Sequence, residues 1–213
     1  PGMYMASTDE LYLKVIGKGG HGAMPHRNID PVLISAHILV ALQQIVSRRS
    51  DATLPCVLSF GKIQGNGATN VIPDFVNLEG TFRTFDEEWR KKAHDLIKEI
   101  AQGTAKAMGG NCEVAVVSGY PHLKNDQALT ADLQRVAKEF LGEEKVFDLP
   151  LRMTAEDFSY FSHEVPACFY RLGTSSSDGT NSESVHTASF DIDEKALETG
   201  VGLMSALAMH LLK

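Results

Sequence analysis

Histidine and paired carboxylate residues mark the places in this sequence where chemistry could occur. His21 lies in a glycine-rich stretch, and His186 follows a long loop rich in glycine and serine. A neutral imidazole is a common zinc ligand and can also exchange a proton. Glu156 and Asp157 are adjacent carboxylates that could bind a metal ion, act as acid or base, or simply favour a helix start.

Two further polar residues could bind a carboxylate. An arginine such as Arg83 grips a carboxylate through two parallel hydrogen bonds, and Asn70 follows a glycine turn. Each has a plainer interpretation. Arg83 could be an exposed strand residue in a surface salt bridge, Asn70 a turn residue and His21 an exposed loop residue. His26 makes a weaker case than His21.

The elements that must position the first of these residues follow from the periodicity of the apolar side chains. Residues 11–16 alternate as in a strand, and a glycine loop that can adopt positive backbone angles follows at 17–20. Asp30 and Pro31 are typical of a helix start, and the helix continues to about Arg49. Its expected apolar positions are Leu33, Ala36, Leu39, Val40, Leu42 and Val46.

The next elements complete a recognisable supersecondary order. Strands are expected at residues 57–62 and 75–83, as an antiparallel pair, with a helix from Asp86 to Gly109 and a fourth strand at 112–117. The order strand, helix, strand, strand, helix, strand is that of ferredoxin-like folds. Residues 9–120 are therefore expected to form a four-stranded antiparallel sheet with two helices on one face.

The remainder of the chain, residues 121–213, has a different pattern. We expect helices at 128–141, 156–161 and 193–212, with short strands near Val146 and at 168–172. These elements are typical of an α/β layer, but they supply too few strands to form a covered sheet alone. The simplest partner is a missing N-terminal half of the same domain. Residues 1–8 would then be the end of that half or a linker.

Several motifs, in order, resemble one family over nearly the whole chain, namely the aminoacylase-like zinc peptidases. The resemblance is closest to hippurate hydrolases, N-acyl-amino-acid amidohydrolases and plant auxin-conjugate hydrolases. The motifs are Gly17 to Ala23 with Pro25 and His26, Asp30-Pro31, Gly67 to Pro73, Gly80 to Arg83, Glu156 to Phe158, and His186.

The resemblance implies an α+β lid domain, which also forms a homodimer, inserted into an α/β catalytic domain that holds two divalent metal ions. The ions would be zinc, or alternatively manganese or cobalt. Most ligands would lie upstream of Pro1, in a Cys-Gly-His-Asp motif, a Glu-Glu pair and a further histidine. This chain would then be a C-terminal fragment that binds metal at most weakly and is inactive alone on N-acyl amino acids.

The same resemblance implies the roles of individual residues. His186 would be the one metal ligand of this chain. His21 would reach into the partner's active site and stabilise the oxyanion. Asn70 and Arg83 would face the carboxylate of the substrate, and Glu156 would lie close to the metal site.

Composition excludes several other classes. The 213 residues carry a net charge of -7 with no cluster of Lys or Arg, so nucleic acid is not an expected partner. The apolar stretches are interrupted and too short to suggest a membrane span. Three single cysteines indicate no disulfide framework. The compartment stays open, with the cytoplasm favoured, and the alternative function is a dimerisation or small-ligand-binding module without catalysis.

Overall fold

The computed structural model describes residues 1–176 and 179–213, and its contacts divide the chain into two compact units. The first, here the sheet unit, comprises Met3–Leu123 and Leu151–His163. The second, here the helical unit, comprises Pro1–Gly2, Lys124–Pro150 and Glu164–Lys213. Each unit has its own cluster of buried apolar side chains.

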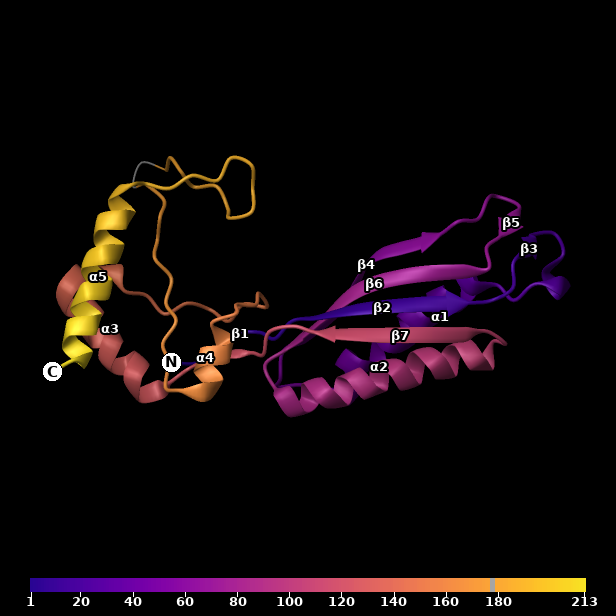
Figure 1. The fold of residues 1–213 in the computed structure, drawn as a ribbon, viewed down its shortest axis with the longest axis horizontal. Helices are drawn as coiled ribbons and strands as arrows, with labels where there is room; N and C mark the ends of the chain where they lie inside the picture. The colour runs from indigo at the N-terminus through magenta and orange to yellow at the C-terminus, as the bar shows by residue number, and fades with distance from the viewer. Residues whose placement is uncertain (177–178) are drawn as a thin grey trace. The chain divides into compact units, whose positions relative to one another are not determined.

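A four-stranded antiparallel sheet forms the centre of the sheet unit. Its strands are β2 (Asp9–Ile16), β4 (Cys56–Gly65), β6 (Phe75–Thr84) and β7 (Asn111–Ser118), arranged in the order β4-β6-β2-β7 (Figure 1). The predicted antiparallel pairing of β4 with β6 is confirmed, and the complete order is that of a ferredoxin-like fold.

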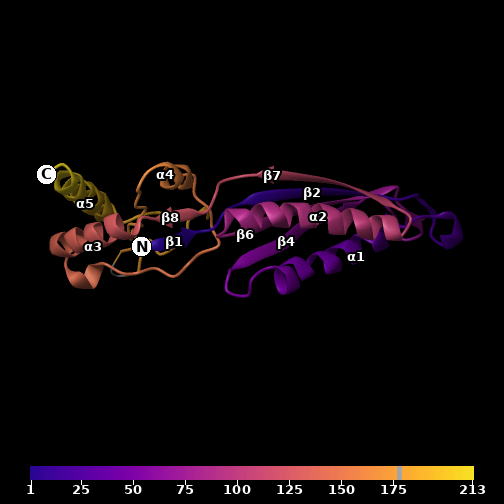
Figure 2. The same ribbon diagram turned by 90° about the horizontal axis from the view of Figure 1, so that it is seen from below.

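Two helices cover one face of this sheet (Figure 2). They are α1 (Pro31–Leu42), which continues after Gln43 and Gln44 into a π-helical turn (Ile45–Arg49), and α2 (Glu87–Ala107). The helix starts are as predicted. Asp30 accepts hydrogen bonds from the amides of Val32 and Leu33, and Asp86 accepts one from Trp89. Alternate residues of β2 and β6 fill the space beneath the helices: Leu11, Leu13, Val15, Val76, Leu78 and Phe82 are buried.

The predicted buried face of α1 was partly wrong. Ile34, Ile38 and Leu42 are buried, whereas Leu33 and Val40 are 51% and 76% exposed. The helix is apolar on every side, so its sequence period does not select one face. For the same reason Pro31–Arg49 is long and apolar enough to pass as a membrane span by length and composition, a test that core helices also pass.

The helical unit is built around α3 (Gln127–Leu141) and α5 (Lys195–Leu211), which pack through Val136, Ala137, Leu203 and Leu207. Both helices were predicted. A 3-10 turn (Glu143–Lys145) follows α3, and the predicted strand at Val146 is absent. The chain crosses between the two units four times: within β1 (Gly2–Met5), within β8 (Leu123–Asn125), between Pro150 and Leu151, and between His163 and Glu164.

The predicted strand at 168–172 was also wrong. These residues have no strand beside them in the part of the helical unit that the structure describes, and a strand needs one for its backbone hydrogen bonds. A side chain supplies two such bonds instead. Asn125 donates to the carbonyl of Phe169 at 2.9 Å and accepts from its amide at 2.7 Å.

Candidate functional site

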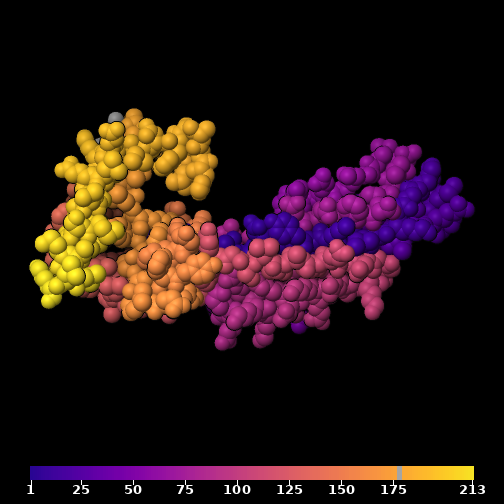
Figure 3. All heavy atoms as spheres, viewed as in Figure 1, coloured from indigo at the N-terminus to yellow at the C-terminus, as the bar shows by residue number. Residues whose placement is uncertain are grey.

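His21 and Asn70 lie side by side at one end of the sheet unit. His21 ends β3 (Gly20–His21), which pairs antiparallel with β5 (Val71–Ile72) so that His21 is opposite Val71. The next amide, that of Gly22, donates to the Asn70 carbonyl at 2.8 Å. Both side chains are exposed. The segment that carries His21 forms this end of the unit in Figures 1 and 3.

Glycines allow the backbone to fold closely enough to build this end. A Cβ on Gly17 would lie 2.1 Å from the Ile29 carbonyl oxygen, and one on Gly19 would lie 2.5 Å from that of Ile72. The Gly19 amide also donates to the Asp74 carboxylate at 2.9 Å. The glycine stretch predicted as a flexible loop is therefore held by close backbone contacts, which only residues without a Cβ permit.

The hydrogen bonds of His21 define its protonation pattern when the ring is neutral. Nδ1 accepts a hydrogen bond from the Ala23 amide at 3.1 Å, so the single proton of the neutral ring belongs on Nε2. The backbone carbonyl of His21 accepts from the Met24 amide and from the Asn28 side chain, which fixes the turn around the imidazole. This arrangement presents an N–H donor rather than a base.

Arg83 contacts the segment that carries Glu156, elsewhere in the sheet unit. Arg83 is half-buried near the end of β6 and donates from Nη1 to the Met153 carbonyl at 2.9 Å. Glu156 follows three residues later and accepts from the Asp157 amide at 3.1 Å, just before α4 (Ser159–Glu164), which starts later than predicted. With a rise of about 3.3 Å per residue, the length of β6 places Arg83 about 26 Å from Phe75, at the end away from β5.

His186 belongs to the helical unit, where it is exposed in a turn. Its φ angle is 68°, in the left-handed region, where histidine is found more often than most residues other than glycine. Among residues 1–176 and 179–213, no group of three or more His, Cys, Asp or Glu side chains could hold a metal ion. The described residues therefore do not by themselves fit a metal pair.

The five predicted residues thus fall into three places: His21 with Asn70, Arg83 with Glu156, and His186 apart in the other unit. Within one copy of the sheet unit, the first pair and the second pair are not brought together. Their roles stay predictions.

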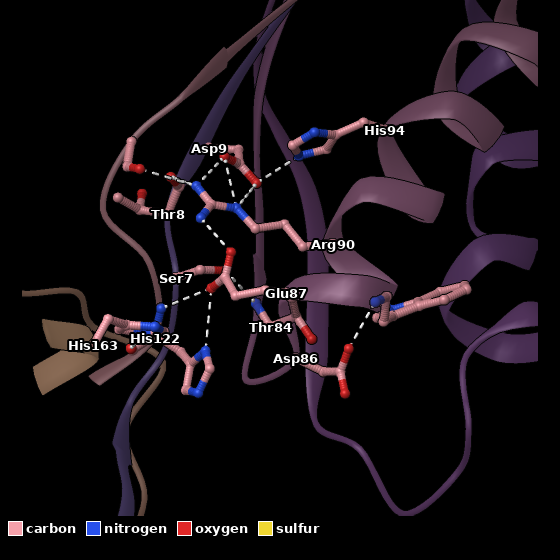
Figure 4. A network of polar contacts seen from close by, with 12 residues as sticks. Ser7, Thr8, Asp9, Thr84, Asp86, Glu87, Arg90, His94, His122 and His163 are labelled. Atoms are coloured by element: carbon pink, nitrogen blue, oxygen red, sulfur yellow. Dashed lines mark hydrogen bonds and ion pairs between the residues drawn. The ribbon is translucent and has the colours of Figure 1, made fainter. Parts of the chain in front are cut away.

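Sequence reasoning missed a buried polar network at the other end of the sheet, where β2 begins (Figure 4). Arg90 binds both carboxylate oxygens of Asp9, with contacts of 2.6–3.2 Å, and also the carbonyls of Thr8 and Gly119. His94 contacts the same carboxylate at 2.7 Å. The signal was present in the spacing of Glu87, Arg90 and His94, which places all three on adjoining turns of α2.

Glu87 extends this network to the segment after β7. It pairs with Arg90 at 2.9 Å and accepts from the backbone amide of His122 at 3.0 Å. Burial would raise the pKa of Glu87, but hydrogen bonds from His122 and Arg90 outweigh it and lower the pKa to about 2. Burial likewise opposes ionisation of Asp9, yet His94 and Arg90 lower its pKa. Every charged group here has a partner.

Comparison with known proteins agrees with this fold. Residues 9–108 match the family model described as a peptidase dimerisation domain of the M20 type. The N-acetyl-L-cysteine deacetylase of Bacillus subtilis is 36% identical over 92% of this chain and 45% of its own length. Residues 9–108 of this chain form a dimerisation domain of the M20 peptidase type.

Other M20 relatives extend the match over nearly all of the chain. The IAA-amino acid hydrolase ILR1-like 4 of Arabidopsis thaliana is 31% identical over 99% of the chain and 49% of its own length. The crystal structure of Bacillus subtilis YXEP, described as a dinuclear metal-binding M20 peptidase, has a TM-score of 0.73 at 26% identity, covering 99% of this chain and 51% of that one. The protein thus spans about half the length of these relatives.

Proposed function

We propose that this chain forms the lid and the last part of the catalytic layer of a metal-dependent amidohydrolase that cleaves the amide bond of N-acyl amino acids. The observation that carries the proposal is that the strand of His21 pairs with β5 directly beside Asn70, with the imidazole held as an Nε2–H donor. Relatives named as an N-acetyl-L-cysteine deacetylase and an N-acetyldiaminopimelate deacetylase support this substrate class.

The proposed role of His21 is electrostatic. As an amide carbonyl is attacked, negative charge develops on its oxygen, and an N–H donor fixed in advance stabilises that charge without reorganising. The bond from the Ala23 amide fixes the ring in the required tautomer. Asn70, exposed on the adjoining turn, would bind the free carboxylate of the same substrate through its amide group.

The metal pair implied by the family would be held mostly by residues outside this chain. His186, exposed in a turn of the helical unit, is the proposed ligand from this chain. When bound, such a metal pair would supply an activated water. Glu156 completes the proposed set, and zinc, manganese or cobalt remain the candidate ions.

A homodimer would bring the two pairs of residues together. His21 and Asn70 lie at one end of the sheet, and Arg83 and Glu156 lie at the other, so a two-fold axis could place the first pair of one copy near the second pair of its partner. The exposed apolar side of α1, with Val32, Leu33 and Val40 50%, 51% and 76% exposed, is the surface we propose for this contact.

The test uses the full-length gene product with N-acetyl and N-benzoyl amino acids. His21→Ala should lower kcat by about 10²–10³. The control is His26→Ala, which removes an exposed imidazole from the neighbouring 3-10 turn (η1, Pro25–Arg27) and should leave kcat unchanged. Equal losses in both variants would contradict the assignment.

Mixed dimers test whether His21 acts across the interface. Neither His21→Ala nor Glu156→Gln should be active alone. Subunits exchanged at equal amounts should recover about a quarter of wild-type activity, because half of the dimers are mixed and each contains one intact site. No recovery would place both residues in the site of one subunit.

The isolated chain should not turn over these substrates even with added zinc. The alternative, a dimerisation or small-ligand module without catalysis, is favoured by the family match being confined to residues 9–108. A native gene product of this length that dimerises and binds an N-acyl amino acid without cleaving it would favour that alternative.

A further inference from the structure

The segment that carries Glu156 is distant in sequence from the rest of the sheet unit but belongs to it by contact. Leu151–His163 groups with Met3–Leu123, while the residues on both sides of the segment, up to Pro150 and from Glu164, group with the helical unit. Something in the sheet unit must therefore hold these thirteen residues in place. The contacts at the two ends of the segment identify what does so.

The first attachment point involves three successive residues before Glu156. Arg152 forms a parallel bridge with Met5, Met153 accepts a hydrogen bond at 2.9 Å from Arg83, and Thr154 accepts one at 3.0 Å from the Ala6 amide. Two of these three contacts are made by backbone atoms of the strand that leads into β2. Of these three contacts, the hydrogen bond from Arg83 is the one made by a side chain, and it is part-buried.

The second attachment point follows Glu156 and lies beside the buried polar network. His163 Nε2 contacts the His122 carbonyl oxygen at 2.8 Å, and the two imidazole rings pack edge to face with their centroids 5.0 Å apart (Figure 4). The rings of Tyr160 and Tyr120 form a similar contact at 6.1 Å. Between the two attachment points, Glu156 accepts from the amides of Asp157 and Ser159 and so starts the turn into α4.

We propose that Arg83 is a positioning residue, which fixes Glu156 for catalysis by holding the Met153 carbonyl. The inference deepens the proposed function and rests on it for the role of Glu156. A guanidinium suits this task because its planar donors are rigid and always charged, so the bond to a carbonyl persists at any working pH. It differs from the role implied by the family resemblance, in which Arg83 contacts the carboxylate of the substrate.

The structural part of the proposal is tested by hydrogen exchange on the full-length protein. Arg83→Met removes the donor and keeps the apolar stem, and it should raise the exchange rates of the amides from 155 to 159 about tenfold while those of β2 and β7 stay unchanged. Lys62→Met is the matched control, since it removes a cation that binds Glu79 on the same sheet. Unchanged exchange at 155–159, or a rise across the whole sheet, would overturn the assignment.

Kinetics separate positioning from direct binding. With Arg83→Lys, which keeps the charge and is the variant more certain to fold, kcat should fall about tenfold with little change in KM. The loss should be the same for an N-acyl amino acid and for its α-carboxamide, because the substrate carboxylate is not involved. A rise in KM confined to the free acid would instead assign Arg83 to the substrate. If the wild-type protein cleaves neither substrate, the proposed function fails, and the exchange result still decides whether Arg83 holds the segment.

Discussion

The two ends of the sheet unit hold their polar side chains in different ways. At the end where β2 begins, Asp9, Glu87 and Arg90 are largely buried and joined to one another and to backbone carbonyls. At the end where β3 meets β5, His21 and Asn70 are exposed, and backbone hydrogen bonds and closely packed glycines hold their loops. The first end uses charge to fix the fold, and the second uses backbone packing to leave its polar groups available.

This difference bears on how a site is recognised. Glu87, whose pKa is lowered to about 2, lies in the buried network. Perturbed pKa values often mark active sites, but structural ion pairs produce them as well. Because each charge in the network is paired, it offers no group to a substrate. The exposed end, where His21 and Asn70 face solvent, is the better candidate for chemistry.

Breaking the buried end should have the largest effect on stability. Arg90→Met leaves the Asp9 carboxylate buried with His94 as its remaining partner, and should lower the free energy of unfolding by about 3–5 kcal/mol. Urea denaturation would measure the loss. As a control, Arg135→Met removes an exposed arginine that pairs with Asp132 and Glu139, and the unfolding midpoint should not change. Similar midpoints for the two variants would mean that the network does not stabilise the fold.

Acid should weaken the same end selectively. The pKa of Glu87 in the folded protein is depressed to about 2 from an ordinary 4.5, so its contribution to stability is present above pH 4.5 and is lost as pH falls towards 2. The loss should amount to about 2–3 kcal/mol. Unfolding free energies measured between pH 6 and pH 2 would reveal it, and Glu87→Gln should flatten the profile over that range. A profile unchanged by the substitution would contradict the assignment.

A perturbation of the open end should be smaller and local. Gly19→Ala places a methyl group 2.5 Å from the Ile72 carbonyl, so the loops must separate, at a cost of about 1–3 kcal/mol. Gly22→Ala is the matched control, because its nearest neighbours are atoms of Asn70 at 3.4 Å, an ordinary contact. Both substitutions shift the amide signals of their immediate sequence neighbours, but we expect the signal of Asn28, whose side chain binds the His21 carbonyl, to shift in the Gly19 variant alone. An equal shift of this signal in both variants would show that close packing does not position His21.

The sequence predicted the architecture well because its local signals agree with one another. Asp30, Asp86 and Asp126 each cap a helix that periodicity had also located, and the alternation in β2 and β6 gave the correct faces. Where such signals conflict or are absent, prediction failed. The apolar residues of α1 surround the helix, and residues 168–172 have strand-like composition without a neighbouring strand among the described residues of the helical unit.

The sequence predicted which residues could belong to a site, but not which of them lie close together. The glycine stretch pointed to the loop of His21, but its pairing with the Asn70 turn brings together residues about fifty positions apart, which no local pattern contains. The contact of Arg83 with Met153 spans a separation of 70 residues and ends on a backbone carbonyl, an atom that every residue has. Side-chain identity at position 153 therefore carries no signal of this contact.

Asn125 gives the helical unit a chemical vulnerability. Its buried side chain imitates a peptide group, donating to the Phe169 carbonyl and accepting from the Phe169 amide. Deamidation to aspartate would change the shape hardly at all, yet it would turn the donor into an oxygen facing another oxygen. Deamidation of Asn125 during storage would therefore release the segment around Phe169. It would also raise the mass of the protein by about one dalton.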